Sequence, residues 1–251
     1  MDTLTLCRED NTPMPQLSVS HPQTTIADAY DIQRELVTRT CGVGGIGGFK
    51  AAAIAAAAQT GLGIDGPITG VMPAAGIRKS TDGHTLRLDD GAPRHVETEI
   101  GYVFGEAVTV ALKDIEALKK VVAYIAPIVE LPGGATMTSQ ATTAADLIAW
   151  NINAREMIVG KPVDASTIDP DRVTIELKHN GVVVNSAKGN QAKDGQWATL
   201  LKVVNGVVGR GYAVEKGFVI TNGALGTILR AEAGRYRADF GTLGTIEFEA
   251  R

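Results

Sequence analysis

The spacing of apolar residues predicts a chain that begins with helices and continues as strands separated by further helices. Thr24 or Thr25 can cap a helix over residues 26–37, where apolar positions recur at helical spacing. The glycines of residues 42–48 end this helix as a connector. The alanine-rich residues 51–58 predict a second helix, because alanine has the highest helix propensity. Later helices are predicted over residues 114–122, 144–157 and 196–208.

Strands are predicted where short apolar or alternating runs lie between turns. The longest runs are residues 95–104 and 124–131. Asn180-Gly181 is typical of a type I′ turn, so residues 173–185 predict a hairpin. Because helices and strands do not alternate regularly, the pattern favours an α+β fold over a doubly wound sheet. The last strands are predicted at residues 218–221, 227–231 and 245–248.

The chain contains no linker-like segment or internal repeat that would divide its 251 residues. We therefore expect a single domain over residues 1–251, with a helical N-terminal part (1–66) and a β-rich, metal-binding core (67–251). The apolar fraction of 44% and the charged fraction of 21% are typical of a globular protein. The net charge of -4, without a basic block, gives no reason to expect a nucleic-acid partner.

Cysteine content and hydropathy favour a cytoplasmic location. Only Cys7 and Cys41 occur, which suits free thiols in a reducing compartment. The sequence has no uncharged apolar run of about 18 residues that could cross a membrane. The acidic residues that follow Met1 do not fit a signal peptide. We therefore expect a cytoplasmic protein without membrane contact.

Residues 42–47 match the G-x-G-x-x-G pattern of dinucleotide-binding proteins. In those proteins the glycines follow a buried strand and let a pyrophosphate approach a helix N-terminus. Here they follow the polar end of a predicted helix, and Asp65, at the distance of a ribose contact, lies among glycines. A glycine connector is the favoured interpretation, and a cofactor-dependent oxidoreductase is the minor alternative.

Three glutamates are the strongest candidates for chemistry. Glu97 and Glu99 are two positions apart in a predicted strand, so their side chains project from the same face. Such a pair can also be a solvated acidic strip on an edge strand. Glu130 lies in an apolar run, where a carboxylate without a partner is costly to bury. If the two strands are neighbours, the three carboxylates converge as ligands for a hard divalent cation, Mg²⁺ or Mn²⁺.

Lys50 supplies a positive charge that such a site can use. It follows Phe49 and precedes a run of apolar residues. An ammonium there can act as a proton donor or as an anchor for a carboxylate near the metal. The alternative is a lysine whose stem is buried while its head reaches water. His95, beside the glutamates, is a second candidate for proton transfer, against a purely structural histidine.

Several further motifs accompany these residues. They are T-I-A-D-A-Y-D-I-Q at residues 25–33, G-F-K at 48–50, P-I-T-G at 67–70, V-E-T-E-I at 96–100, P-I-V-E at 127–130, D-L-I-A-W-N at 146–151 with Gly160, V-I-T-N-G at 219–223 and F-G-T-L-G at 240–244. Their order and spacing resemble the hydratase/decarboxylase branch of the fumarylacetoacetate hydrolase superfamily. The resemblance covers nearly the whole chain.

This resemblance implies a mixed β-roll with flanking helices, of the type of the superfamily's C-terminal domain, normally assembled as a homo-oligomer. It implies that Glu97, Glu99 and Glu130 bind Mg²⁺ or Mn²⁺ and that Lys50 is catalytic. The positions expected to bind substrate or to support the site are Asp146, Asn151, Thr221 and Gly223. For Asp146 and Asn151 the alternative is helix capping and ordinary packing.

Four places depart from the family pattern. Residues 51–54 replace a polar stretch after the lysine, and residues 131–134 replace an acidic segment that is followed by arginine. Ile68 replaces an aspartate of many hydratases and is expected of the decarboxylase type, while Trp150 stands where aspartate is usual. The metal ligands therefore match the family better than the residues expected around the substrate.

The resemblance implies a metal-dependent lyase that binds a 2-oxo or 2-hydroxy carboxylic acid. The main hypothesis is a hydratase that adds water to a 2-hydroxy-2,4-dienoate and gives a 4-hydroxy-2-oxo acid. One alternative is a 4-oxalocrotonate-type decarboxylase acting on a 2-oxo-3-enedioate, which Ile68 favours. Two others are an acylpyruvate C–C hydrolase and a non-catalytic, metal-binding partner subunit, the last motivated by the departures.

Overall fold

The computed structural model describes residues 1–10, 12–41, 45–88, 93–133 and 141–251. Its strands are β1 (Ile46–Ala52), β2 (Ile68–Pro73), β3 (Ile77–Lys79), β4 (Thr85–Leu86), β5 (His95–Phe104), β6 (Val122–Leu131), β7 (Glu156–Val159), β8 (Val163–Asp164), β9 (Thr174–His179), β10 (Val182–Lys188), β11 (Val219–Thr221), β12 (Leu229–Arg230), β13 (Gly234–Asp239) and β14 (Thr245–Ala250). Its α-helices are α1 (Asp2–Glu9), α2 (Leu17–Ser20), α3 (Ile26–Cys41), α4 (Ala56–Leu62), α5 (Ile115–Val121), α6 (Ala144–Ala149) and α7 (Gln196–Gly209).

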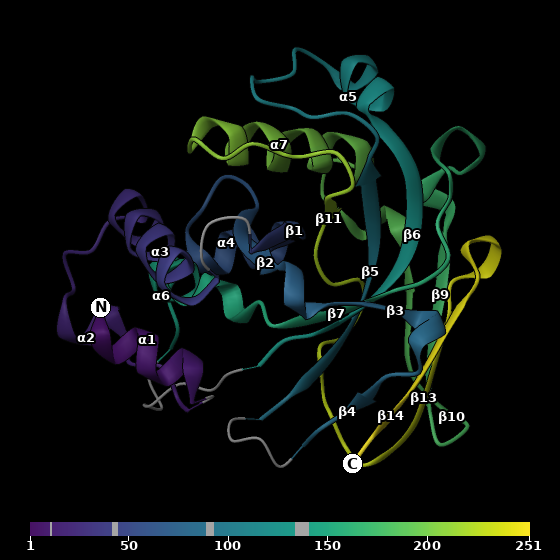
Figure 1. Cartoon of the computed structure of the whole chain (residues 1–251), viewed down its shortest axis with the longest axis horizontal. Helices are drawn as coiled ribbons and strands as arrows, with labels where there is room; N and C mark the ends of the chain where they lie inside the picture. Colours follow the sequence, from purple (N-terminus) through teal and green to yellow (C-terminus); the bar gives the residue numbers. More distant parts are fainter. Residues whose placement is uncertain (11, 42–44, 89–92, 134–140) are drawn as a thin grey trace.

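Two sheets form the centre of the molecule. The larger has the strand order β2-β1-β11-β5-β6-β7-β3, with β12 paired to β5 and β8 paired to β6. It is mixed, because β1 runs parallel to β11 and antiparallel to β2. The smaller sheet has the order β10-β9-β13-β14-β4. Helices α1, α2, α3 and α6 gather on one side of the larger sheet, and α7 lies across its end (Figure 1). The expected α+β class is confirmed.

The core joins the two sheets. One buried cluster contains Ile100 and Ile125 from the larger sheet, Leu177 and Phe248 from the smaller sheet, and Val204 from α7. A second cluster packs α3 and α6 against β2. A core shared between the sheets supports the expectation of a single domain, which stays a prediction. Within the described residues, no helix is long and apolar enough to cross a membrane.

The helix predicted for residues 51–58 is wrong. Residues 46–52 form β1, and α4 begins only at Ala56. The strand lies between β2 and β11, with Phe49 and Ala51 each 1% exposed. Burial between two strands therefore outweighs the helix propensity of alanine. The expected connector is partly replaced by this strand, and residues 42–44 lie outside the described part of the chain.

The helix predicted for residues 144–157 is too long. It ends at Ala149, and residues 156–159 form β7. Between them Asn151, Ile152 and Asn153 have φ values of 56°, 50° and 54°. Asparagine tolerates this left-handed conformation, whereas isoleucine adopts it rarely. Other predictions are confirmed, among them the strand over residues 95–104, the Asn180-Gly181 hairpin and the helix starting at residue 196. Helix α1 and strand β13 were not predicted.

Candidate metal centre and pocket

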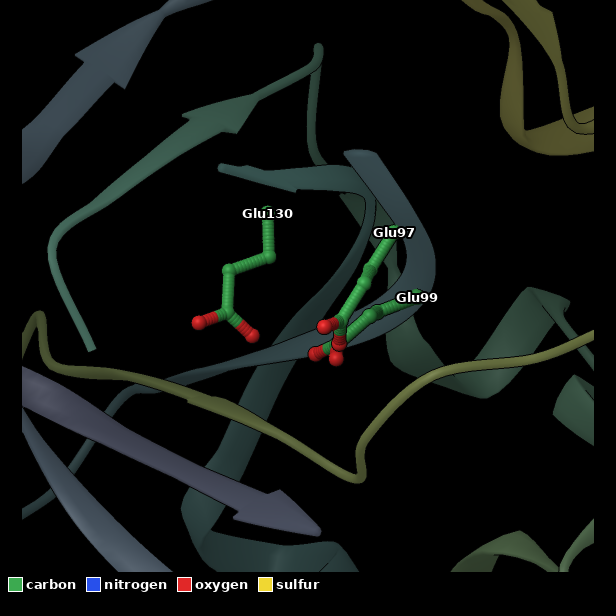
Figure 2. Close-up of side chains that lie close together, drawn as sticks. All are labelled: Glu97, Glu99 and Glu130. Atoms are coloured by element: carbon green, nitrogen blue, oxygen red, sulfur yellow. The ribbon is translucent and has the colours of Figure 1, made fainter. Parts of the chain in front are cut away.

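The three glutamates meet because β5 and β6 are antiparallel neighbours. Glu97 lies directly opposite Glu130 in the ladder, and Glu99 follows on the same face of β5. Figure 2 shows the three carboxylates turned toward one another. One carboxylate oxygen from each residue lies within 4.8 Å of the others. The residues are 8%, 0% and 0% exposed in chain order, so the alternative of a solvated acidic strip is wrong.

Lys50 is buried with this cluster. It projects from β1, and its Nζ forms an ion pair with Glu130 Oε1 and donates a hydrogen bond of 3.3 Å to the carbonyl oxygen of Ile152. Its side chain is 3% exposed, so the alternative in which the ammonium reaches water is wrong. Burial alone would lower the pKa of Lys50, but the charges of the three glutamates outweigh burial and raise it. The ammonium is therefore held in its charged form.

The carboxylates carry more charge than Lys50 can neutralise. Burial raises the pKa of Glu99, and the charges of Glu130 and Glu97 raise it further. Burial, with the charge of Glu97, also raises the pKa of Glu130, and Lys50 opposes both shifts. Among the residues that the structure describes, both oxygens of Glu99 and Oε2 of Glu130 are buried without a hydrogen-bond partner. Buried, unpartnered carboxylate oxygens that converge from two strands are suitable ligands for a hard divalent cation. The residues present therefore fit such an ion.

Thr221 and Gly223 lie where β11 passes between β1 and β5. Thr221 is paired with Lys50 in β1 and with Gly101 in β5. Its Oγ1 is buried beside Glu99, where it tends to lower the pKa of that carboxyl, and it forms no close hydrogen bond with the described residues. Gly223 has a φ of +94°, and a Cβ atom there would lie 2.8 Å from the carbonyl oxygen of Ala51. Glycine thus lets the segment after β11 pass close to the end of β1.

Asp146 lies in α6 and Asn151 just after it, and neither belongs to the carboxylate cluster. The Asp146 carboxylate accepts hydrogen bonds from Ser18 and Thr143, caps α6 and fastens α2 to it. It does not line the pocket described below. Asn151 accepts a hydrogen bond of 2.6 Å from the backbone N–H of Val71 and donates one of 2.7 Å to its carbonyl oxygen. This pairing holds the left-handed turn whose next residue, Ile152, accepts the hydrogen bond from Lys50.

A pocket of about 420 Å³ opens beside Lys50 and Glu97. The other polar side chains that line it are His95 and Asn153. The remaining lining residues are Ala52, Ala53, Ile54, Ala55, Ala58, Pro132, Leu147, Ile152, Ala224, Gly226 and Ile228. The lining residues in the turn after α6 and in the segment after β11 were not predicted from the sequence. No local motif marks them, because they join the pocket only through the strand order.

A buried carboxylate cluster on neighbouring strands of a mixed sheet, with Glu97 lining an apolar pocket, defines the class of site. No protein-family model matches the chain. It is 23% identical over 243 residues to the 2-keto-4-pentenoate hydratase of Paraburkholderia xenovorans, covering 95% of this chain and 89% of the relative. The values for 2-keto-4-pentenoate hydratase 3 of Pseudomonas putida are the same.

Solved structures show the same fold over the full length. The 4-oxalocrotonate decarboxylase of Pseudomonas putida G7, complexed with magnesium and adipate, superposes with a TM-score of 0.91 at 19% identity, covering 100% of this chain and 95% of that one. Its complex with calcium and acetate gives a TM-score of 0.87, also at 19% identity, and covers 100% and 98%. The expected β-roll and the resemblance to the hydratase/decarboxylase branch of the fumarylacetoacetate hydrolase superfamily are confirmed.

Proposed function

We propose that this chain is a divalent-metal-dependent lyase that acts on a 2-oxo acid or on its 2-hydroxy-dienoate form. The preferred reaction is that of a hydratase, which adds water to a 2-hydroxy-2,4-dienoate and gives a 4-hydroxy-2-oxo acid. The observation that carries the proposal is the set of buried carboxylate oxygens of Glu99 and Glu130 that have no hydrogen-bond partner among the described residues. They lie beside Lys50 and Glu97, and these two residues line the pocket. The similarity to named hydratases over 95% of the chain supports it.

Glu97, Glu99 and Glu130 would hold Mg²⁺ or Mn²⁺, because carboxylate oxygens are the ligands these cations prefer. When bound, the cation supplies a Lewis acid for the C2 oxygen and one carboxylate oxygen of the substrate. The register of β5 and β6 holds the three carboxylates in place before any ligand arrives. The protein would therefore bind the cation without rearranging its sheet, as preorganised sites do.

Lys50 is proposed to hold and deliver a proton at Nζ. An ammonium has three N–H donors, and Glu130 and Ile152 accept from two of them. The third is available to a ligand in the pocket that Lys50 lines. Because the raised pKa keeps the nitrogen protonated, Lys50 acts as a donor rather than as a base. Thr221 is proposed to add a hydroxyl contact, since its buried Oγ1 lies beside Glu99 and forms no close hydrogen bond within the described part of the chain.

Decarboxylation of a 2-oxo-3-enedioate is the second candidate, because the decarboxylase structure superposes over the whole chain. Ile68 supports the decarboxylase only weakly, because this residue does not line the pocket. It packs in the buried cluster that also contains Ala29 and Ile148. The hydrolase and the non-catalytic subunit remain further alternatives. We also propose a cytoplasmic homo-oligomer. The two free thiols, Cys7 and Cys41, support the location, and sedimentation velocity measures the assembly state.

A steady-state assay with Mg²⁺ tests the proposal. We expect consumption of 2-hydroxypenta-2,4-dienoate with formation of 4-hydroxy-2-oxopentanoate, loss of turnover after chelation, and recovery when Mg²⁺ or Mn²⁺ is returned. Release of CO₂ from a 2-oxo-3-enedioate without water addition would assign the decarboxylase instead. Binding of Mg²⁺ without turnover of any 2-oxo acid would support the non-catalytic subunit.

A further inference from the structure

The walls of the pocket differ in chemistry from its floor. Lys50 is the one lysine or arginine among the described lining residues, and its Nζ is already paired with Glu130. Away from Lys50 and Glu97 the lining is mostly alanine, isoleucine, leucine and proline side chains. The pocket therefore offers a charged site for one end of a ligand and an apolar surface for the rest of it.

This division affects acids with one and with two carboxylates differently. The first carboxylate of a 2-oxo acid, together with its keto oxygen, would lie at the floor, where Lys50 and the proposed cation can interact with it. A second carboxylate further along the ligand would face less exposed side chains such as Ile54, Leu147 and Ile152. It would lose water there without gaining a lysine or arginine partner among the described lining residues, which is unfavourable. A methyl or alkyl end would bury apolar surface instead.

We propose that the pocket selects 2-oxo acids that have a single carboxylate and an apolar tail, and that it disfavours dioic acids. The inference rests on the proposed function, since it takes the 2-oxo acid head from it. A volume of about 420 Å³ lies in the range of sites that enclose a whole small ligand, so the tail can extend beyond the end of a five-carbon acid. Ile228 is 55% exposed and Ala58 is also exposed, so both lie near solvent, whereas Ile54 is 5% exposed.

Two six-carbon acids provide a matched test. 2-Oxohexanoate and 2-oxoadipate share the head and chain length and differ only in a methyl or a carboxylate at the far end. In calorimetric titrations of the Mg²⁺-loaded protein, we expect 2-oxohexanoate to bind at least about tenfold more tightly, because the second carboxylate has no partner. We expect 2-oxooctanoate to bind no more weakly than 2-oxohexanoate.

Equal or tighter binding of 2-oxoadipate would overturn the inference and leave the proposed function standing. Weaker binding of 2-oxooctanoate would remove the claim that a longer tail fits. Failure of all three acids to bind the Mg²⁺-loaded protein, while pyruvate and oxalate also fail, would overturn the proposed function and the inference together. The readout is binding, so it does not depend on which reaction the protein catalyses.

A charge placed on the wall sharpens the test. Ile228→Arg adds a guanidinium near the expected position of the tail, and we expect it to reduce the preference for 2-oxohexanoate over 2-oxoadipate by about fivefold or more. Val110→Arg is the matched control, because Val110 is 71% exposed and lies outside the pocket. Ala58→Arg is the second variant if Ile228→Arg does not fold. An unchanged preference in folded variants of both positions would contradict the placement of the tail.

Discussion

The two ends of the pocket are built by different parts of the fold. At the charged end, Lys50 and Glu97 line the pocket, and Glu99 and Glu130 lie beside them. All four residues project from strands of one sheet. At the apolar end, the side chains come mainly from the segment after β1, the turn after α6 and the segment after β11, as with Ile228. Ladder hydrogen bonds fix the first set, whereas the second set depends on connections between elements.

This difference agrees with the expectation that the metal ligands match the family pattern better than the residues around the substrate do. A change of side chain in residues 51–54 alters the wall without moving the register that places Glu97 opposite Glu130. Loops on a rigid scaffold can vary in this way while the scaffold keeps the chemistry. We therefore expect substitutions at the charged end to change catalysis and charge balance most. Substitutions near the apolar end should act indirectly, by shifting the residues that contact the charged end.

Glu99→Gln should have the largest effect. We expect turnover to fall by about 10²–10³-fold and Mg²⁺ affinity to fall with it, because the amide removes the charge of one of the three proposed ligands. The metal-free protein should become more stable by about 1 kcal/mol, since the substitution removes a buried charge whose oxygens have no partner. Calorimetric Mg²⁺ titration and urea unfolding of the metal-free protein measure the two effects.

Glu106→Gln is the control for this prediction, because Glu106 is exposed just after β5. It should leave affinity, turnover and stability unchanged. If Glu99→Gln lowers the free energy of unfolding of the metal-free protein, Glu99 stabilises the fold. The prediction that its buried charge destabilises the metal-free protein would then be wrong.

Lys50→Met should destabilise the protein. Removal of the ammonium leaves Glu130 buried without its ion pair, and breaking one side of such a pair costs about 3–5 kcal/mol. Urea unfolding of the metal-free variant measures the loss. Lys188→Met is the control: Lys188 is exposed on β10, and its substitution should change stability by less than about 0.5 kcal/mol. Equal stability of the two variants would show that Lys50 does not compensate the carboxylates.

The convergence of the three glutamates was predictable from the sequence because it depends on local rules. The two-residue spacing of Glu97 and Glu99 sets their common face, and the apolar run around Glu130 indicates burial. The strand over residues 95–104 was predicted to the residue. The one non-local assumption was that the two strands are neighbours, and the ladder confirms it.

The apolar end was harder to predict because its parts depend on tertiary structure. Alanines at residues 51 and 52 favour a helix in isolation, and only the position of β1 between β2 and β11 makes them a strand. The turn at Asn151 is selected by its pairing with Val71, 80 residues away in sequence. Gly70, opposite it, leaves room: a Cβ there would lie 2.7 Å from the carbonyl oxygen of Asn151. Neither constraint appears in the residues next to Asn151.

Asn151→Ala tests whether the turn after α6 affects catalysis by holding Ile152 in place beside Lys50. The variant loses both hydrogen bonds to Val71 and should lose about 2 kcal/mol of stability. Turnover should fall by about tenfold, because the left-handed turn relaxes and Ile152 no longer holds its carbonyl oxygen toward Lys50.

Asn205→Ala is a matched control, because Asn205 pairs in the same way with the backbone N–H and carbonyl oxygen of Leu112, outside the pocket. It should lose a similar amount of stability and keep its turnover. Equal losses of turnover in Asn151→Ala and Asn205→Ala would mean that general destabilisation, rather than the position of Ile152, accounts for the effect.

Asp146→Asn should have the smallest effect, and that effect should depend on pH. Burial alone would raise the pKa of Asp146, but hydrogen bonds from Ser18 and Thr143 outweigh it and lower the pKa in the folded protein. A carboxylate with a lowered pKa stabilises the fold above its ordinary pKa, and this contribution is lost as the pH falls through the lowered value. The free energy of unfolding of the wild type should therefore be about 1 kcal/mol higher than that of the variant at pH 6.

The difference between wild type and Asp146→Asn should shrink below about pH 4, where the unfolded carboxylate becomes protonated. Urea unfolding at pH 6 and at the lowest pH at which both proteins fold measures it. Asp164→Asn should give a smaller difference, because Asp164 accepts the same kind of hydrogen bonds from Ser166 in an exposed turn. Since Asp146 lies outside the pocket lining, turnover should fall less than in Asn151→Ala. A larger fall would place Asp146 in the catalytic machinery and would extend the charged end of the pocket to α6.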